Sequence, residues 1–584
     1  MDDSKSNMEE LHVPMNENDD DDIDDLDIKT EFKKNIGKTV IYSVDNSPPW
    51  HLCIILGFQH YLTAVGGIIS IPMILSEYFC MDKDVLGISE LMGTFLFVSG
   101  MATLLQTTFG VRLPIVQGST PTFLVPTIAI LLQPQWTCPY TEARIQYGQS
   151  VNFTNLGLPE VGSSGHRDIW KARILEIQGA IIIASFVQIF IGLSGIMNFA
   201  LKYIGPLSIV PVIVLTGLSL FPAGLKLASG QWWIALLTMC LVLLFSQYMD
   251  TARIASARTS YLKQRIFTFF NMFPVLFAIV GSCIVCTILT LTDVLPNIPD
   301  QWGYMARIDR NVYVMHESNW FRFPYPGQWG TPTVSVASVL GMVAGVVAAM
   351  LESIGDYYAC ARLSGAPSPP MHAINRGVFI EGICCVLAGA WGSGNGTTSF
   401  SENIGVIGIT KVGSRRVVQV GGCLMLVLGC LGKFSALFTL IPEPIYGGMF
   451  VVSFGMVAAV GLSNLQYVDL NSSRNLCIIG VALFIGQSVP TWIHQNDAIK
   501  TGSEICDQIF SVLLGTSMFV GGATGFILDN TIPGSEHERG VTAWRTSGSS
   551  FKKHGNIQDG DIYDPPFYRR FYSKTLSKFC PVLP

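Results

Sequence analysis

Long stretches without a charged residue constrain this chain more than any other feature. Thirteen windows, from residues 52–76 to residues 508–528, are apolar and contain no Asp, Glu, Lys or Arg. A helix needs about 20 apolar residues to cross the hydrocarbon core of a bilayer, and each ion placed there is costly. Together with the short apolar segment 403–410, these windows predict an all-α polytopic membrane protein of about 14 transmembrane segments.

The distribution of charge excludes several classes of protein. Charged residues make up 13% of the chain, which is roughly half the share usual in soluble proteins. The first fifty residues have a net charge of −9, and the rest of the chain has a net charge of only +3. This pattern excludes a soluble enzyme, a nucleic-acid-binding protein with a basic face and a disordered scaffold.

The positions of Lys and Arg predict the orientation of the segments. Most of these residues fall at even-numbered junctions when the acidic N-terminus is cytosolic, as the positive-inside rule requires. Both termini are then cytosolic in a plasma-membrane protein, and the two longest loops, 133–173 and 293–330, are extracellular. The first loop contains a glycosylation sequon at Asn152. Cys80 and Cys138 also fall outside, where an oxidising environment permits a disulfide between them.

Two carboxylates stand at the end of an uncharged segment. Glu352 and Asp356 follow about twenty uncharged residues and are four positions apart, so they share one face of a helix. Such residues line a substrate or ion pathway, form an ion pair with a neighbouring helix, or lie near the cytosolic end of the segment, and Arg362 makes the last of these interpretations credible. A further membrane carboxylate, Glu381, is interpreted as structural.

A third carboxylate, Glu402, follows a break rich in Gly, Ser and Thr. This composition is typical of a discontinuous helix whose free backbone N–H groups face a cavity. The sequence QGSTPTFLVP from Gln117 is similar to NGTTSFSENI from Asn395, 278 residues later. These are the third and tenth predicted elements, and an offset of seven reverses the direction of crossing. The echo therefore predicts two inverted seven-segment repeats whose interrupted elements meet at a substrate site.

Several motifs resemble those of the nucleobase/ascorbate transporter family. GFQHYL and LESIGDYYACARLSGAP are similar to the first-helix and eighth-helix motifs of that family. The resemblance covers about residues 50–530. The family signature falls within SENIGVIGITKVGSRR, on Glu402, Asn403, Gly405, Thr410 and Lys411.

The resemblance implies a core domain of segments 1–4 and 8–11, a gate domain of the other segments, and homodimers that work by an elevator-like movement. The implied divisions of this chain are an acidic cytosolic tail at 1–50, core at 51–201, gate with an extracellular loop at 202–330, core at 331–437, gate at 438–528 and a cytosolic tail at 529–584.

The resemblance also implies a class of substrate. Ascorbate carriers that resemble this chain have Pro at the position of Glu402, whereas bacterial uracil carriers have Glu there and bind the base with it. Uracil, thymine, xanthine, hypoxanthine and guanine present neutral N–H donors to a buried carboxylate, while two carboxylates repel the ascorbate anion. Glu352 and Glu402 are therefore expected to bind a nucleobase, framed by backbone at Phe400, Ser401 and Pro121. Pro121 replaces an aromatic residue of the bacterial relatives.

The coupling ion follows from Asp356. Proton-coupled bacterial carriers have His at this position, whereas sodium-coupled vertebrate members resemble this chain. A carboxylate is a hard oxygen ligand that suits a hard cation. We expect Na⁺ symport, with Asp356 as a ligand and His60 and Thr398 as further candidates. The alternatives are a Na⁺-coupled ascorbate transporter and a proton-coupled nucleobase carrier.

Other classes of membrane protein fit the sequence less well. A channel favours rings of pore-lining residues. A membrane enzyme needs a nucleophile, metal or redox centre, and GSGNG lacks the Lys of a phosphate-binding loop. An anion exchanger of the sulfate-carrier type is disfavoured by two carboxylates. The expected partners are a small nucleobase, the lipid bilayer and a second copy of the chain, and not a nucleic acid.

Overall fold

Helices that can cross a membrane make up most of the structure. It is a computed structural model that describes residues 40–81, 84–147, 153–197, 199, 203–249, 270, 273–298, 301–496, 499–541, 562–564 and 581–582. Within these ranges nine helices are long and apolar enough to span a bilayer, and a pair of helices bent by 78° makes a tenth candidate. The prediction of a helical, multi-pass membrane protein is confirmed, while the count of 14 segments stays a prediction.

One long span consists of two helices, α8 (Pro206–Ser219) and α9 (Phe221–Ser229), which are separated by a short break. The other long helices are α2 (Trp50–Tyr78), α3 (Val85–Thr108), α6 (Ser164–Ser194), α13 (Pro274–Leu291), α15 (Val336–Ser364), α16 (Met371–Trp391), α20 (Glu443–Ser463) and α21 (Ser473–Asn496).

The bent pair consists of α22 (Glu504–Gly515) and α23 (Ser517–Thr531). The other shorter helices are α4 (Pro121–Leu131), α5 (Pro139–Tyr147), α10 (Trp232–Leu243), α14 (Val312–Glu317), α17 (Ser401–Thr410), α18 (Arg415–Gly429) and α19 (Gly432–Thr439). The strands are β1 (Gln117–Ser119) and β2 (Thr397–Ser399). A π-helical turn, η3 (Leu244–Tyr248), follows α10, and the 3₁₀ turns are η1 (Pro134–Trp136), η2 (Phe153–Leu156), η4 (Tyr304–Ala306), η5 (Asp309–Asn311) and η6 (Asn464–Tyr467).

The contacts between helices define two groups, each built from both halves of the chain. In the first group α6 packs along α16, α3 packs against α18, and α15 contacts α4, α6 and α17. In the second group α20 packs on α8, α9 and α10, and α23 packs on α8 and α21. The assignment of these groups to a core and a gate domain remains a prediction.

Glycine permits the closest of these approaches. A Cβ atom added to Gly100 on α3 would lie 2.6 Å from the carbonyl oxygen of Gly422 on α18, closer than real Cβ atoms come. In a membrane, where lipid solvates apolar side chains, helices associate through such small residues because they let the backbones come close.

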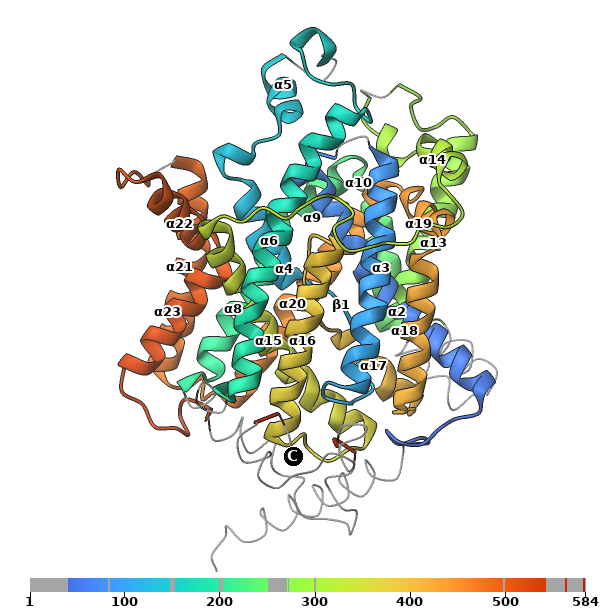
Figure 1. Ribbon diagram of the computed structural model, residues 1–584. Coiled ribbons are helices and arrows are strands. Elements are labelled where there is room, and N and C mark those ends of the chain that lie inside the picture. The colour runs from blue at the N-terminus through green and yellow to red at the C-terminus, as the bar shows by residue number, and fades with distance from the viewer. Residues whose placement is uncertain are drawn as a thin grey trace, which may run out of the picture.

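The described ends of the chain lie at one end of the bundle. The amide of Ile41 donates to the carbonyl oxygen of Lys411 at 2.8 Å. Nearby, Nη2 of Arg415 donates to the carbonyl oxygen of Ile562 at 3.1 Å. Helices α5 and α14, which belong to the two long loops, lie at the opposite end (Figure 1). The described chain ends and the long loops thus lie on opposite sides, while the side that faces the cytosol stays a prediction.

A disulfide joins Cys80 to Cys138 near α5, with the two Cα atoms 5.6 Å apart. It ties the turn after α2 to the start of the first long loop. Asp84 next to it begins α3, because its side chain accepts a hydrogen bond from the amide of Gly87 at 3.0 Å. The expected glycosylation site, Asn152, lies outside the described residues.

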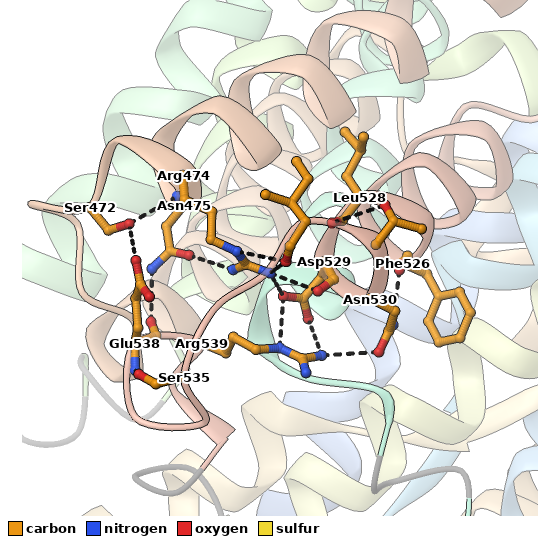
Figure 2. Close-up of polar contacts among 12 residues, drawn as sticks. Ser472, Arg474, Asn475, Phe526, Leu528, Asp529, Asn530, Ser535, Glu538 and Arg539 are labelled. Atoms are coloured by element: carbon orange, nitrogen blue, oxygen red, sulfur yellow. Dashed lines mark hydrogen bonds and ion pairs between the residues drawn. The ribbon is translucent and has the colours of Figure 1, made fainter.

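A buried ion-pair cluster lies where α21 begins and α23 ends (Figure 2). Asp529, which is 1% exposed, accepts hydrogen bonds at 3.0 Å from Nη2 of Arg474 and from both Nε and Nη2 of Arg539. A buried carboxylate is stable here because two guanidinium groups neutralise it. Helical packing therefore continues past residue 528, where the sequence places the start of a cytosolic tail.

Candidate functional site

The two interrupted elements meet inside the first group of helices. Strands β1 and β2 pair antiparallel, with Gln117 opposite Ser399, and Nε2 of Gln117 donates to Oγ of Ser399 at 3.0 Å. The amide of Thr120 donates to Oδ1 of Asn395 at 2.9 Å. The two sequences that echo each other are thus in direct contact, in the antiparallel relation that an inverted repeat predicts.

A short helix begins directly after each strand. Pro121 is the first residue of α4, where its fixed φ suits a helix start and its missing N–H is no loss. Phe400 is the N-cap of α17, whose first backbone N–H groups have no capping side chain. The ring of Phe400 covers β1, since a Cβ atom at Gly118 would lie 2.7 Å from Cζ of the ring. The uncapped donors and the positive end of the helix dipole make this terminus attractive to acceptors.

Three predicted carboxylates surround the start of α17. Glu352 on α15 accepts a hydrogen bond from Oγ1 of Thr120 at 3.4 Å. Asp356, one turn further along α15, accepts at Oδ1 from Oγ of Ser401 at 2.8 Å. Glu352, Asp356 and Glu402 are close enough to repel one another electrostatically. None of the three forms an ion pair with Lys or Arg in the described part of the chain.

The surface beside these carboxylates is open. Glu402 has an exposed side chain, although it lies in a helix of the membrane region. Gly355 on α15 and Gly405 on α17 are exposed, and nothing lies within 4 Å of a Cβ atom added to either. Each glycine follows a glutamate by three positions, so that each helix has one carboxylate and one gap on the same face.

The expected Na⁺ ligands have separate partners in the structure. Oδ2 of Asp356 is buried and has no hydrogen-bond partner, so this oxygen is available to a cation. His60 on α2 is held by Asn403, whose Nδ2 donates to the backbone oxygen of His60 at 2.8 Å. Oγ1 of Thr398 lies 2.6 Å from Oγ of Ser353. Because Asp356 is the candidate with a charged oxygen that is both buried and unpaired, it is the strongest of the three candidates.

Glu381, which the sequence analysis treats as structural, lies behind β2. The residue is fully buried and accepts hydrogen bonds from Oγ of Ser353 at 2.9 Å, Oη of Tyr357 at 2.9 Å and Nε2 of Gln188 at 3.3 Å. All three donors are uncharged. Because Ser353 also contacts Thr398, this network supports the strand beneath the site.

Sequence reasoning missed two residues of the site. Thr120 contacts both Glu352 and Asn395, and Ser353 joins Glu381 to β2. Thr120 could have been found, because it lies within the repeated motif directly before Pro121. Nothing local distinguishes Ser353 from the other small residues of its helix.

The architecture and the site define a class of protein. Two broken elements that meet among carboxylates, inside a bundle of apolar helices, are typical of membrane transporters for small molecules. The sequence pattern of a family described as "Permease family" matches residues 51–495.

Known relatives define the family. Solute carrier family 23 member 1 of Mus musculus is 48% identical over 93% of this chain and 89% of its own length. Solute carrier family 23 member 2 of Homo sapiens is 49% identical over 90% of this chain and 80% of its own length. Nucleobase-ascorbate transporter 1 of Arabidopsis thaliana is 34% identical over 91% and 97%. Among solved structures, that of SLC26A9 has a TM-score of 0.49 at 12% identity, over 83% of this chain and 69% of that chain.

The chain belongs to the nucleobase/ascorbate transporter family, solute carrier family 23. The resemblance found in the sequence motifs is confirmed, and the protein is a transporter and not an enzyme.

Proposed function

We propose that this protein is a Na⁺-coupled symporter of uncharged nucleobases. The observation that supports the proposal best is the pair Glu352 and Glu402, two neighbouring carboxylates on different helices, neither of them fully buried, without a cationic partner among the described residues. Two such carboxylates accept hydrogen bonds from the ring N–H groups of a neutral base. Ascorbate at neutral pH is an anion, and the same two groups repel it.

Hydrogen-bond acceptors and hydrogen-bond donors together orient the bound base. The two glutamates accept hydrogen bonds, while the uncapped N–H groups at the start of α17 donate to a carbonyl oxygen of the base. The ring of Phe400, which is 8% exposed, bounds the site from the side of β1. An aromatic face beside a planar heterocycle adds contact area.

Sodium neutralises the charge that such a site would otherwise leave in the membrane. Oδ2 of Asp356 is the free oxygen, and Oδ1 is fixed by Ser401, one residue before Glu402. A cation at Asp356 reduces the repulsion among the three carboxylates, so that Na⁺ and base bind better together than separately. Without the ion, the carboxylates oppose one another across a poorly solvated space.

Transport requires that the site reach both sides of the membrane. The site lies wholly within the first group of helices, on α15, α17 and the two strands. We propose that this group is the core domain, that it slides against the second group as an elevator, and that the protein works as a homodimer in the plasma membrane with both termini in the cytosol.

Uptake in cells that express the chain tests this proposal. Labelled uracil, hypoxanthine and ascorbate are supplied separately, in Na⁺ medium and in choline medium. We expect Na⁺-dependent accumulation of a nucleobase and none of ascorbate. Ascorbate uptake without nucleobase uptake would overturn the proposed substrate class. Na⁺-independent uptake that rises with acidity would overturn the proposed coupling to Na⁺.

A further inference from the structure

The segment 319–335, which lies between α14 and α15 in the sequence, runs along the first group of helices (Figure 1). On α3, Nη1 of Arg322 donates to the carbonyl oxygen of Glu90 at 2.9 Å. On α16, Nε1 of Trp391 donates to the carbonyl oxygen of Pro324 at 3.1 Å. The end of the second long loop is therefore fixed to helices of the membrane region and does not stand away from them.

Two further contacts extend this attachment. The amide of Thr333 donates to the carbonyl oxygen of Leu175 on α6 at 3.2 Å. The amide of Arg322 donates to the carbonyl oxygen of Cys430, directly after α18, at 2.9 Å. The segment therefore contacts four helices of the first group, namely α3, α6, α16 and α18.

These contacts coincide with the points where charge ends along the helices. On α3, Glu90 is followed by the uncharged residues 91–111, and on α6, Leu175 and Glu176 are followed by the uncharged residues 177–201. Helix α16, which ends at its contact with the segment, has 21 residues and is about 30 Å long, equal to the thickness of a hydrocarbon core. Because charged residues are costly in hydrocarbon, the segment marks the edge of this core at the end of the bundle that carries the long loops.

The side chains of the segment are arranged unlike those of a solvated loop. Its only charged residue, Arg322, is turned toward the protein, where Nη2 donates to Oε1 of Gln328. Four aromatic side chains are instead between 56% and 78% exposed, and we call them the aromatic patch: Trp320, Phe321, Phe323 and Tyr325. An exposed apolar surface of this kind marks a site of interaction with a protein or a membrane.

The aromatic patch is continuous with the apolar surface of α18. The backbone of Phe321 pairs antiparallel with Leu431, just past the end of that helix. Val427, in the last turn of α18, is exposed and lies within the uncharged residues 417–432. A surface that joins a membrane helix at the edge of the hydrocarbon core fits lipid, because lipid already covers the exposed apolar side chains of the helix below it.

We infer that the aromatic patch lies in the interfacial layer of the bilayer, between the acyl chains and the headgroups, so that the segment 319–335 is a membrane-bound part of the loop and not a solvated one. Rings of Trp and Tyr favour this layer, because they are apolar and carry an N–H or O–H group that reaches water. Nζ of Lys433 lies 6.0 Å from the ring centroid of Trp320, where its charge attracts lipid phosphates. The inference depends neither on the transported substrate nor on the proposed movement.

Photolabelling of the full chain in phospholipid vesicles tests this location. Two phosphatidylcholine probes are compared, with a diazirine near the headgroup (shallow) or at the end of an acyl chain (deep), and adducts are mapped by peptide mass spectrometry. We expect the shallow probe to give about threefold more adduct on the aromatic patch than the deep probe does. Ile284, exposed near the middle of α13, should show the reverse preference. Ile145, exposed on α5 in the first long loop, is the control that neither probe should label (Figure 1).

Hydroxyl-radical oxidation of the same vesicles measures contact with water. We expect the aromatic patch to be oxidised less than Ile145, which is more exposed to solvent in the structure. Lipid adducts on Ile284 without adducts on the patch would overturn the inference. If the patch were then oxidised as readily as Ile145, the segment would be a solvated loop. Protection of the patch from both the lipid probes and the radicals would show that a protein surface covers it, such as a second copy of the chain.

Discussion

Ser401 donates its hydroxyl hydrogen to Oδ1 of Asp356 at 2.8 Å, and this bond ties the first turn of α17 to α15. Glu402, the next residue on α17, and Glu352, one turn before Asp356 on α15, are the groups proposed to bind the base. Any ion that binds Oδ2 of Asp356 therefore acts on the helix that presents Glu402. The contact gives a direct physical route for coupling between ion and substrate.

Substitutions at this contact should affect the binding of Na⁺ more directly than the binding of the base. Asp356→Asn removes the charge and is expected to abolish Na⁺-dependent uptake. Ser401→Ala removes one hydrogen bond to a charged group, which is worth about 1.5–3 kcal/mol, so the Na⁺ concentration for half-maximal uptake should rise by roughly 10- to 100-fold. Uptake measured as a function of Na⁺ concentration checks both. Normal Na⁺ activation of Asp356→Asn would show that the ion binds elsewhere.

Loss of the carboxylate at Glu402 should weaken the binding of nucleobases. A hydrogen bond to a charged group contributes about 1.5–3 kcal/mol, so Glu402→Gln should raise the substrate KM by roughly 10- to 100-fold. Because the side chain is exposed and has no ion pair among the described residues, surface expression should be unchanged. The matched control is Glu160→Gln, at an exposed residue between η2 and α6. Unaltered transport in Glu402→Gln would show that this glutamate is structural.

Two glycines of the first group should respond differently to the same change. A methyl group on Gly118 collides with the ring of Phe400, so Gly118→Ala should destabilise the protein by about 1–3 kcal/mol and lower its Tm in detergent. A methyl group on Gly355 meets nothing, so Gly355→Ala should keep the Tm and reduce only uptake by filling the open surface. Adding Phe400→Leu should partly restore the Tm of Gly118→Ala. Equal Tm values for the two single variants would contradict the close packing of Phe400 on β1.

The disulfide between Cys80 and Cys138 should stabilise the end of the protein that carries the two long loops. The two residues are 58 positions apart, and closing a loop of this size stabilises a fold by roughly 2–4 kcal/mol. We expect the double variant Cys80→Ser/Cys138→Ser to have a lower Tm while retaining Na⁺-dependent uptake. Peptide mapping without reductant should find the two cysteines linked in the unaltered protein. A free thiol at either position would exclude the bond.

Much of the architecture follows from local composition. Uncharged windows of about twenty residues have few alternatives to a membrane helix, because a backbone in lipid must satisfy its own hydrogen bonds. The breaks before Pro121 and Ser401 were visible because Gly, Ser and Thr interrupt apolar runs there. Helix pairing was not visible in the same way, since windows that are apolar on all sides do not reveal which face meets a neighbour.

The candidate site also contains some features that the sequence predicts and others that only the folded structure decides. Glu352, Asp356 and Glu402 could be predicted as candidates from the sequence alone, because a carboxylate within an apolar segment is costly in lipid and is usually functional. The partners of these groups depend on folding. Thr120 reaches Glu352 across 232 positions of sequence, and Gln117 reaches Ser399 across 282.

The tail shows this difference most clearly. Its polar composition resembles that of a solvated segment, yet Tyr563 is fully buried and Asp529 is paired with two arginines. The amino-acid composition indicates the free energy of placing each residue in lipid or in water, independently of the other residues. Burial and pairing depend on which distant groups arrive at the same place, and only the packing of the helices brings Arg376 and Arg415 together around the end of the chain.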